Sequence, residues 1–125
     1  MKYLLLIYTD EAAAAAAQAN VTPEEQAAQT KVWYDYGDWL IEKGWIVTGD
    51  PLQPTATATL VRSPDGKPVV TDGPFAETKE QLAGYYLLDV ANVDEAIEAG
   101  ARCPAATWGT IELRPVQDFP ARPEA

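Results

Sequence analysis

Three charged residues between two apolar stretches have the types and spacing needed for acid–base chemistry: Asp72, Glu77 and Lys79. A carboxylate that is partly buried at the mouth of a cavity has a raised pKa and can act as a general base. Lys79 can neutralise an anionic substrate, and Glu77 can form hydrogen bonds beside Asp72. We therefore predict that Asp72 and Lys79 are catalytic and that Glu77 contacts the substrate.

The same residues also have plain structural explanations. Asp72 followed by Gly73 is typical of a turn in which the carboxylate accepts backbone hydrogen bonds and the glycine adopts a positive φ. Glu77, Lys79 and Glu80 are typical of a solvated charged surface. Both explanations remain open at the level of the sequence.

Histidine is absent, and cysteine occurs once, at Cys103. Serine–histidine and cysteine–histidine nucleophiles are therefore excluded, as is a zinc or iron site with histidine ligands. Asp10, Asp72 and Glu77 could hold a hard cation through oxygen ligands, but their spacing is not that of a calcium-binding loop. We predict neither a metal site nor a cofactor.

Two aromatic residues and one arginine are further candidates for substrate binding. Phe75 suits a core position as well as a substrate platform, and Tyr86 suits sheet packing with its hydroxyl at the rim. Arg114 suits a cross-strand ion pair as well as a substrate clamp. The tryptophans around the first long helix are assigned to the core or to a dimer interface rather than to a ligand cage: Trp33, Trp39 and Trp45.

The charge balance restricts the partners. The chain has 19 acidic and 9 basic residues, a net charge of −10, so it would repel a polyphosphate such as nucleic acid. The apolar run Leu4 to Ile7 is too short for a membrane span or for the core of a signal peptide. We predict no nucleic-acid or membrane partner, and a cytoplasmic location.

The elements that must position these residues follow from periodicity and from helix end signals. Thr22 as N-cap, Pro23 at the first helical position and Gly44 as the stop predict a helix over 22–43. Asn92, with Glu95 three residues later, predicts a second helix to about Arg102. The remaining elements are strands over 2–8, 45–50, 84–90 and 107–116, and a hairpin from about 55 to 72.

This order predicts an α+β fold, a ferredoxin-like split β-α-β sandwich with an inserted β-hairpin. Residues 1–116 form the single domain, and residues 117–125, which contain Pro120 and Pro123, form a tail. The strands over 2–8 and 84–90 are apolar on both faces, but one layer of helices covers only one face of a sheet. We therefore expect two chains to stack their sheets as a homodimeric α+β barrel.

Four segments also carry a family resemblance: MKYLLLIYTDE at the start, LQPTATATLVR at 52–62, TDGPFAETKEQLAGYYLLDV at 71–90 and ARCPAATWGTIELRPV at 101–116. They resemble the YCII-related family in its DGPF subgroup. The resemblance implies a dimeric ferredoxin-like barrel, and subgroup members are often encoded beside extracytoplasmic-function sigma factors. Relatives proposed as enzymes pair an aspartate after the first strand with a histidine. Asp10 matches the aspartate and is our third catalytic candidate, but this chain has no histidine to complete the pair.

The functional expectation is a small-molecule pocket lined by Asp10, Asp72, Glu77 and Lys79, with acid–base chemistry such as elimination or hydrolysis. The alternative is a non-enzymatic interaction or sensing module that binds a regulatory protein linked to a sigma factor.

Overall fold

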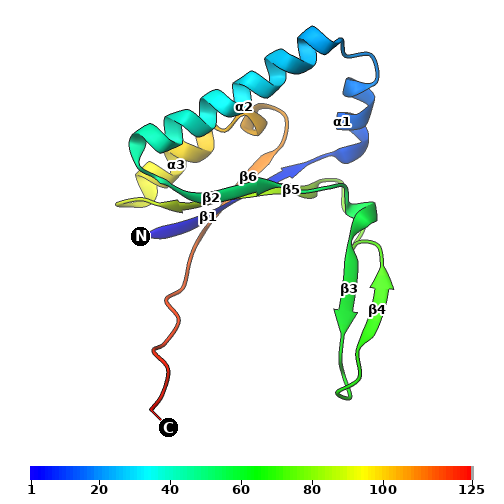
Figure 1. Cartoon of the computed structure of the whole chain (residues 1–125), viewed down its shortest axis with the longest axis vertical. Coiled ribbons are helices and arrows are strands. Elements are labelled where there is room, and N and C mark those ends of the chain that lie inside the picture. The colour runs from blue at the N-terminus through cyan, green and yellow to red at the C-terminus, as the bar shows by residue number, and fades with distance from the viewer. Residues whose placement is uncertain (125) are drawn as a thin grey trace.

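A four-stranded antiparallel sheet organises the chain (Figure 1). Its strands lie in the order β2 (Ile46–Pro51), β5 (Gln81–Asp89), β1 (Lys2–Thr9) and β6 (Thr110–Pro115). This computed structural model describes residues 1–124. Helices α2 (Pro23–Lys43) and α3 (Val93–Arg102) cover one face of the sheet (Figure 1). The predicted α+β, ferredoxin-like fold is confirmed.

The helix boundaries agree with the predicted capping residues. Thr22 Oγ1 accepts a hydrogen bond from the Glu25 N–H (3.1 Å), and Gly44 ends α2 with φ of 73°. Asn92 Oδ1 accepts from the Glu95 N–H (3.0 Å) and starts α3. The alanine-rich segment forms a short helix, α1 (Glu11–Gln18), whose N-cap is Asp10.

The two central strands are apolar on both faces, as predicted. Tyr3, Leu5 and Ile7 of β1 and Leu88 of β5 face the helices and belong to the buried core. The alternate residues face the other side, where no described helix covers them (Figure 1). We call this side the bare face; its apolar centre consists of Leu4, Leu6 and Tyr8 from β1 and Leu82, Tyr85 and Leu87 from β5.

The predicted hairpin is present but shorter than expected. Strands β3 (Thr59–Arg62) and β4 (Val69–Asp72) pair with each other and form a separate two-stranded sheet. Thr55–Thr57 form a 3₁₀ turn, η1, rather than strand, because the Thr57 N–H and hydroxyl both bond to the Pro54 carbonyl. We call residues 59–72 the arm; it projects from the sheet toward the side of the bare face (Figure 1).

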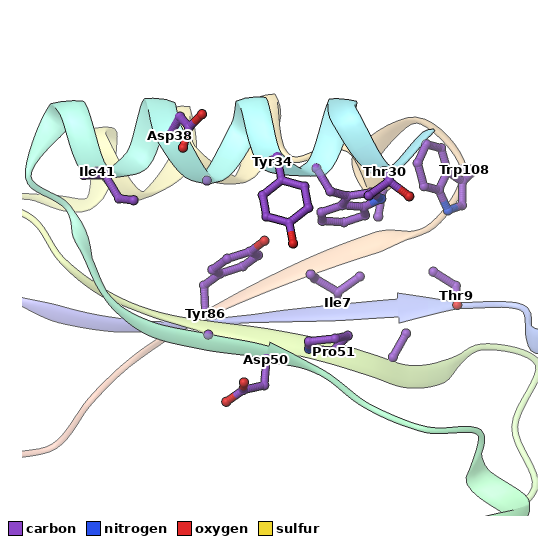
Figure 2. Close-up of a pocket in the computed structure, with 16 residues that line it drawn as sticks. Ile7, Thr9, Thr30, Tyr34, Asp38, Ile41, Asp50, Pro51, Tyr86 and Trp108 are labelled. Atoms are coloured by element: carbon purple, nitrogen blue, oxygen red, sulfur yellow. The ribbon is translucent and has the colours of Figure 1, made fainter. Parts of the chain in front are cut away.

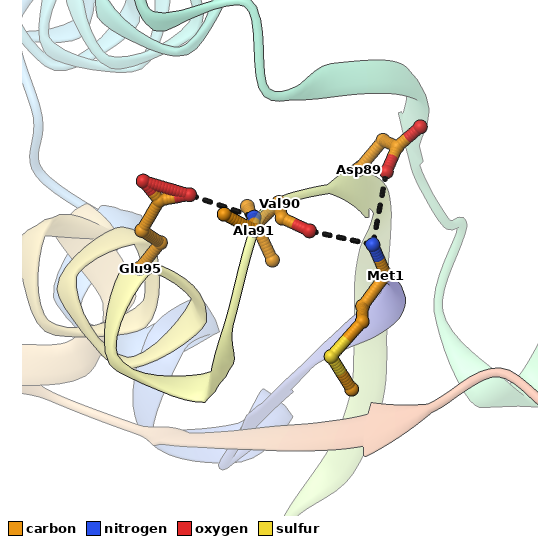
Figure 3. A network of polar contacts seen from close by, with 5 residues as sticks. All are labelled: Met1, Asp89, Val90, Ala91 and Glu95. Carbon is orange, nitrogen blue, oxygen red and sulfur yellow. Dashed lines mark hydrogen bonds and ion pairs between the residues drawn. The ribbon is translucent and has the colours of Figure 1, made fainter.

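The start of β1 is tied to the end of β5 (Figure 3). The Met1 amino group donates to the Val90 carbonyl (2.6 Å) and lies 3.4 Å from Asp89 Oδ1. Next along the chain, the Ala91 N–H donates to Glu95 Oε1 (2.7 Å), which joins β5 to the first turn of α3. These contacts fix the sheet relative to α3.

Beyond β6, the Val116 N–H donates to the Lys2 carbonyl (2.9 Å). Residues 117–124 form neither helix nor strand and extend from the sheet on the same side as the arm (Figure 1). The last position of the predicted tail, 125, lies outside the described residues. Within residues 1–124, none of the helices has both the length and the apolar character that crossing a bilayer requires.

Candidate functional site

A cavity of about 680 Å³ lies between α2 and the β2–β5 side of the sheet. We call it the α2 cavity. Helix α2 supplies its roof, and strands β1, β2 and β5 supply its floor. Ala105 and Trp108 close one end from η2 (Pro104–Thr107) and the residue after it.

Three glycines lie along this cavity: two of them allow close packing of its floor, and one leaves open space in its roof. A Cβ on Gly49 would lie 2.4 Å from Tyr86 Cδ1, so only glycine in β2 lets the Tyr86 ring lie against that strand. A Cβ on Gly84 would lie 3.1 Å from the Asp50 carbonyl oxygen, which is also a tight contact. A Cβ on Gly37, in α2, would meet nothing within 4 Å, so this position opens into free space. The sequence also draws attention to Gly37, because a glycine within a helix lowers the stability of the helix by about 1 kcal/mol relative to alanine. Such a glycine often has a packing or functional reason.

The lining of the α2 cavity is mainly aromatic and aliphatic. Trp33 and Tyr34 come from α2, Tyr86 from β5 and Trp108 from the end of η2. Figure 2 shows the Tyr34 hydroxyl directed down from the helix and the Tyr86 hydroxyl directed up from the sheet. Burial raises the pKa of Tyr86, so its phenol stays protonated at neutral pH and can donate a hydrogen bond.

Two carboxylates belong to the lining, but neither points inward. Asp38 and Asp50 are exposed, and Figure 2 shows both side chains directed away from the space between helix and sheet. Asp50 Oδ2 instead accepts a hydrogen bond from the Tyr85 hydroxyl (2.8 Å) on the bare face. The interior of the cavity is therefore uncharged.

A second cavity of about 570 Å³ lies between α1 and α2. It shares Trp33 and Trp108 with the α2 cavity, and these rings meet edge to face with centroids 6.4 Å apart. Asp10 lines the second cavity, but Asp10 Oδ1 accepts a hydrogen bond from the Ala13 N–H (3.0 Å). The Asp10 carboxylate therefore has a structural task as the N-cap of α1.

The polar segment after the arm is exposed. Gly73 has φ of 104°, and its N–H donates to the Ala58 carbonyl (2.8 Å) at the base of the arm. Phe75 is 79% exposed, with the Arg62 guanidinium 5.8 Å from its ring centre, so the alternative of a core position for Phe75 is wrong. Glu77 and Lys79 are exposed as well, which agrees with a solvated surface.

The two cavities contain only two of the predicted site residues, and each cavity contains a different one: Tyr86 lines the α2 cavity and Asp10 lines the second. Asp10 lies at the same end of the sheet as the start of β5, because the Glu11 N–H donates to Gln81 Oε1 (2.9 Å). Asp72 ends β4 in the arm, away from that sheet. The four predicted residues of this segment, Asp72, Phe75, Glu77 and Lys79, line neither of the two cavities described above. Their functional roles stay predictions.

The two other predicted residues lie on opposite faces of the sheet. Tyr86 is part of the α2 cavity. Arg114 projects from the bare face, with its Nε 3.9 Å from Glu112 Oε2. Glu112 is two residues back on the same strand, so this ion pair runs along β6 rather than across the sheet. Among residues 1–124, no three acidic, cysteine or histidine side chains gather in a way that could hold a metal ion.

Sequence reasoning missed most of the α2 cavity. Tyr34 and Gly37 of α2 and Gly49 of β2 were not among the predicted site residues. Trp33 packs against the core as predicted, but it also lines both cavities. The mid-helix glycine was the one local signal that pointed to this place.

Comparison with known proteins agrees with this fold. A family model described as the YCII-related domain matches residues 1–120. An uncharacterised protein of Rhizobium meliloti (strain 1021), R00369, is 36% identical over 118 residues, which cover 93% of this chain and 92% of the relative. This chain belongs to the YCII-related family.

Proposed function

We propose that this YCII-related protein is a homodimer that binds a small, uncharged and largely apolar molecule in the α2 cavity. The observation that carries the proposal is the aromatic cavity of about 680 Å³ with two phenol hydroxyls, from Tyr34 and Tyr86. Ligand pockets are typically about 300–1,000 Å³, largely apolar, with a few polar groups that orient the ligand. Placement in the DGPF subgroup, from the motif at 72–75, is part of the same proposal.

The charges favour a neutral ligand. No cationic side chain lines the described cavity, and the whole chain has a net charge of −10, so an anionic ligand would be disfavoured. A cation would lose its hydration without gaining a carboxylate partner, because Asp38 and Asp50 point outward. A flat aromatic molecule with one hydroxyl or carbonyl group fits both the rings and the two phenols.

Binding is the core of the proposal, and catalysis is an extension of it. Acid–base chemistry such as elimination or hydrolysis would use Asp10, Asp72 or Lys79. Asp10 already caps α1, and Asp72 and Lys79 lie outside the cavity lining. Turnover would therefore require the polar segment to approach a bound substrate.

The bare face supports the homodimer. Its centre is apolar, and the hydroxyls of its two tyrosines reach polar partners on the outer strands: the Tyr8 hydroxyl donates to Glu112 Oε1 (3.0 Å) and the Tyr85 hydroxyl to Asp50 Oδ2 (2.8 Å). An apolar centre with a hydrogen-bonded polar rim is the usual composition of a protein interface. Stacking two such faces covers the apolar rows of β1 and β5.

The test of ligand binding uses Gly37, the open position in the roof. Gly37→Leu would place a side chain into the cavity, whereas Gly37→Ala would add one methyl group and serves as the matched control. Neutral aromatic probes such as indole and p-cresol would be titrated while tryptophan fluorescence and NMR shifts are recorded. We expect the leucine variant to bind at least roughly tenfold more weakly, since a side chain of that size would occupy much of the probe's space.

Both variants should also fold at least as stably as the wild type, because each replaces a helical glycine. The expected gain for Gly37→Ala is about 0.5–1 kcal/mol in the free energy of unfolding. Equal probe affinity in Gly37→Leu and wild type, or no binding of any neutral aromatic probe, would contradict the proposed site.

A second candidate function is a non-enzymatic sensing module that engages a regulatory protein. The observation that favours it is the exposed arm together with the exposed Phe75, whose ring lies beside Arg62 of the arm. On this alternative, purified protein would bind no neutral aromatic probe and would remain a monomer at tens of micromolar concentration. A purified sigma-factor partner would then be the molecule to titrate.

A further inference from the structure

The arm has no core of its own. Val61 and Val70 face each other directly across the ribbon, and they are 64% and 61% exposed. Val69, on the other face opposite Arg62, is also exposed. An isolated two-stranded hairpin is at best marginally stable in water, and exposed apolar side chains on both faces add to that difficulty.

The arm nevertheless has the features of a fixed element. Four residue pairs are in register, and Gly66 turns the ribbon with φ of 76°. Its base is tied to the sheet end, since Glu11 accepts hydrogen bonds from the Thr55 N–H (2.9 Å) and hydroxyl (2.8 Å). A regular ribbon with an anchored base and uncovered valines is suited to packing against another surface.

Its position points to a second copy of this chain as that surface. The arm extends on the side of the bare face, past the plane of the sheet (Figure 1). Four strands about 4.8 Å apart and about 20 Å long span a face of roughly 400 Å² in projection. Stable interfaces bury on the order of 800 Å² of accessible surface per partner, so the bare face alone would make a small one.

The charge distribution also favours a second copy of this chain as the partner of the arm. The arm, residues 59–72, carries two cations, Arg62 and Lys67, against two anions, Asp65 and Asp72, and so is neutral on a chain of −10. The remainder of each copy is therefore strongly acidic, and two such bodies repel each other. A neutral arm approaches the acidic body of a second copy without the repulsion that the two bodies experience.

We propose that in the homodimer each arm packs its Val61–Val70 face against the second copy, beside the stacked sheets. Twofold symmetry places two such contacts in one dimer, one from each arm. The arms enlarge the interface and bury the valines that a single chain leaves exposed. This inference rests on the homodimer of the proposed function.

The test changes the arm surface but keeps the ribbon. In the double variant Val61→Lys/Val70→Glu, opposite charges face each other across the strands, which favours the hairpin while removing its apolar face. The control is Ile97→Glu, which introduces a charge at an exposed apolar residue (53%) of α3, on the helix side of the sheet. Sedimentation equilibrium gives the dimer Kd, and hydrogen exchange reports protection of residues 59–71.

We expect a dimeric wild type, a Kd on the order of a hundredfold higher in the arm variant, and faster exchange in its arm. The Ile97→Glu control should keep the wild-type Kd. If circular dichroism shows that the charged variant is misfolded, Val61→Thr/Val70→Thr keeps β-branching at both positions and should raise the Kd roughly tenfold.

Two outcomes separate this inference from the proposed function. A Kd within twofold of wild type in a folded arm variant would overturn the arm contact and leave the homodimer standing. A monomeric wild type would overturn both, and would make a different protein the candidate occupant of the arm.

Discussion

Two buried residues at the α2–α3 contact, Tyr36 of α2 and Cys103 at the end of α3, have raised pKa values that affect stability. The Tyr36 hydroxyl donates to the Ala99 carbonyl (2.6 Å), which joins α2 to α3. Burial raises the pKa of Tyr36, and it raises the pKa of the Cys103 thiol to about 11. A thiol with a raised pKa is a poor nucleophile at neutral pH, so we interpret Cys103 as an inert core residue.

The Cys103 thiol predicts a loss of stability at alkaline pH. Below about pH 9 the thiol is protonated in both the folded and the unfolded chain, so its contribution to stability is complete. Between about pH 9 and 11 the unfolded chain loses the proton and the folded chain keeps it. Unfolding then becomes easier by up to about 1.4 kcal/mol per pH unit from this group.

The measurement is urea denaturation of wild type and Cys103→Ala from pH 8 to 11. Tyr36 and Tyr86 still contribute in both proteins, so the informative quantity is the difference between the two slopes. The alanine variant should lose stability less steeply between pH 9 and 11. Parallel slopes would contradict the assignment.

At the scale of elements, α2 links the best-predicted part of the sequence to the candidate site. Its N-cap at Thr22 and its stop at Gly44 were predicted from local signals, and it forms the roof of the α2 cavity. Much of its outer surface is solvated, so the helix depends on its end contacts as well as on the buried Tyr36 and Leu40.

Thr22→Ala should therefore destabilise the protein by about 1 kcal/mol, because the Glu25 N–H would lose its hydrogen-bond partner. Thermal unfolding should show a melting temperature roughly 3–5 °C lower. Thr22→Asn provides the control, since asparagine is also a good N-cap and should preserve most of the stability. A melting temperature for Thr22→Ala equal to that of Thr22→Asn would argue against a stabilising cap at this position.

At the scale of the whole molecule, the main feature is the bare face, an apolar surface that none of the described helices covers. Leu4 lies at its centre, next to Leu87 on β5 and Arg114 on β6. Leu4→Glu would place a carboxylate near Arg114, so the single chain should tolerate it. In a stacked dimer the same carboxylate would enter an apolar interface without sufficient compensation.

We expect Leu4→Glu to be monomeric by light scattering under conditions in which the wild type is a dimer. Its melting temperature should be independent of concentration, whereas that of the wild type should rise with concentration. A dimer of unchanged affinity in Leu4→Glu would place the interface elsewhere.

The sequence by itself determined the elements, their order and the two-faced character of the central strands. These follow from interactions between near neighbours: caps at Thr22 and Asn92, the stop at Gly44, and side chains that alternate along a strand. Few topologies are compatible with this order of elements, so the ferredoxin-like sheet could be predicted from the sequence.

Only the tertiary structure decided where the cavities lie and which polar residues are near them. At the α2 cavity, Gly37 of α2 leaves open space, while Gly49 of β2 and Gly84 of β5 allow their strands and the Tyr86 ring to pack closely. Asp72 and Lys79 are close in sequence to β5, but the arm holds Asp72 outside the sheet that carries the cavity. A cavity forms where segments far apart in the sequence do not fill the space between them. No local sequence pattern predicts such a space.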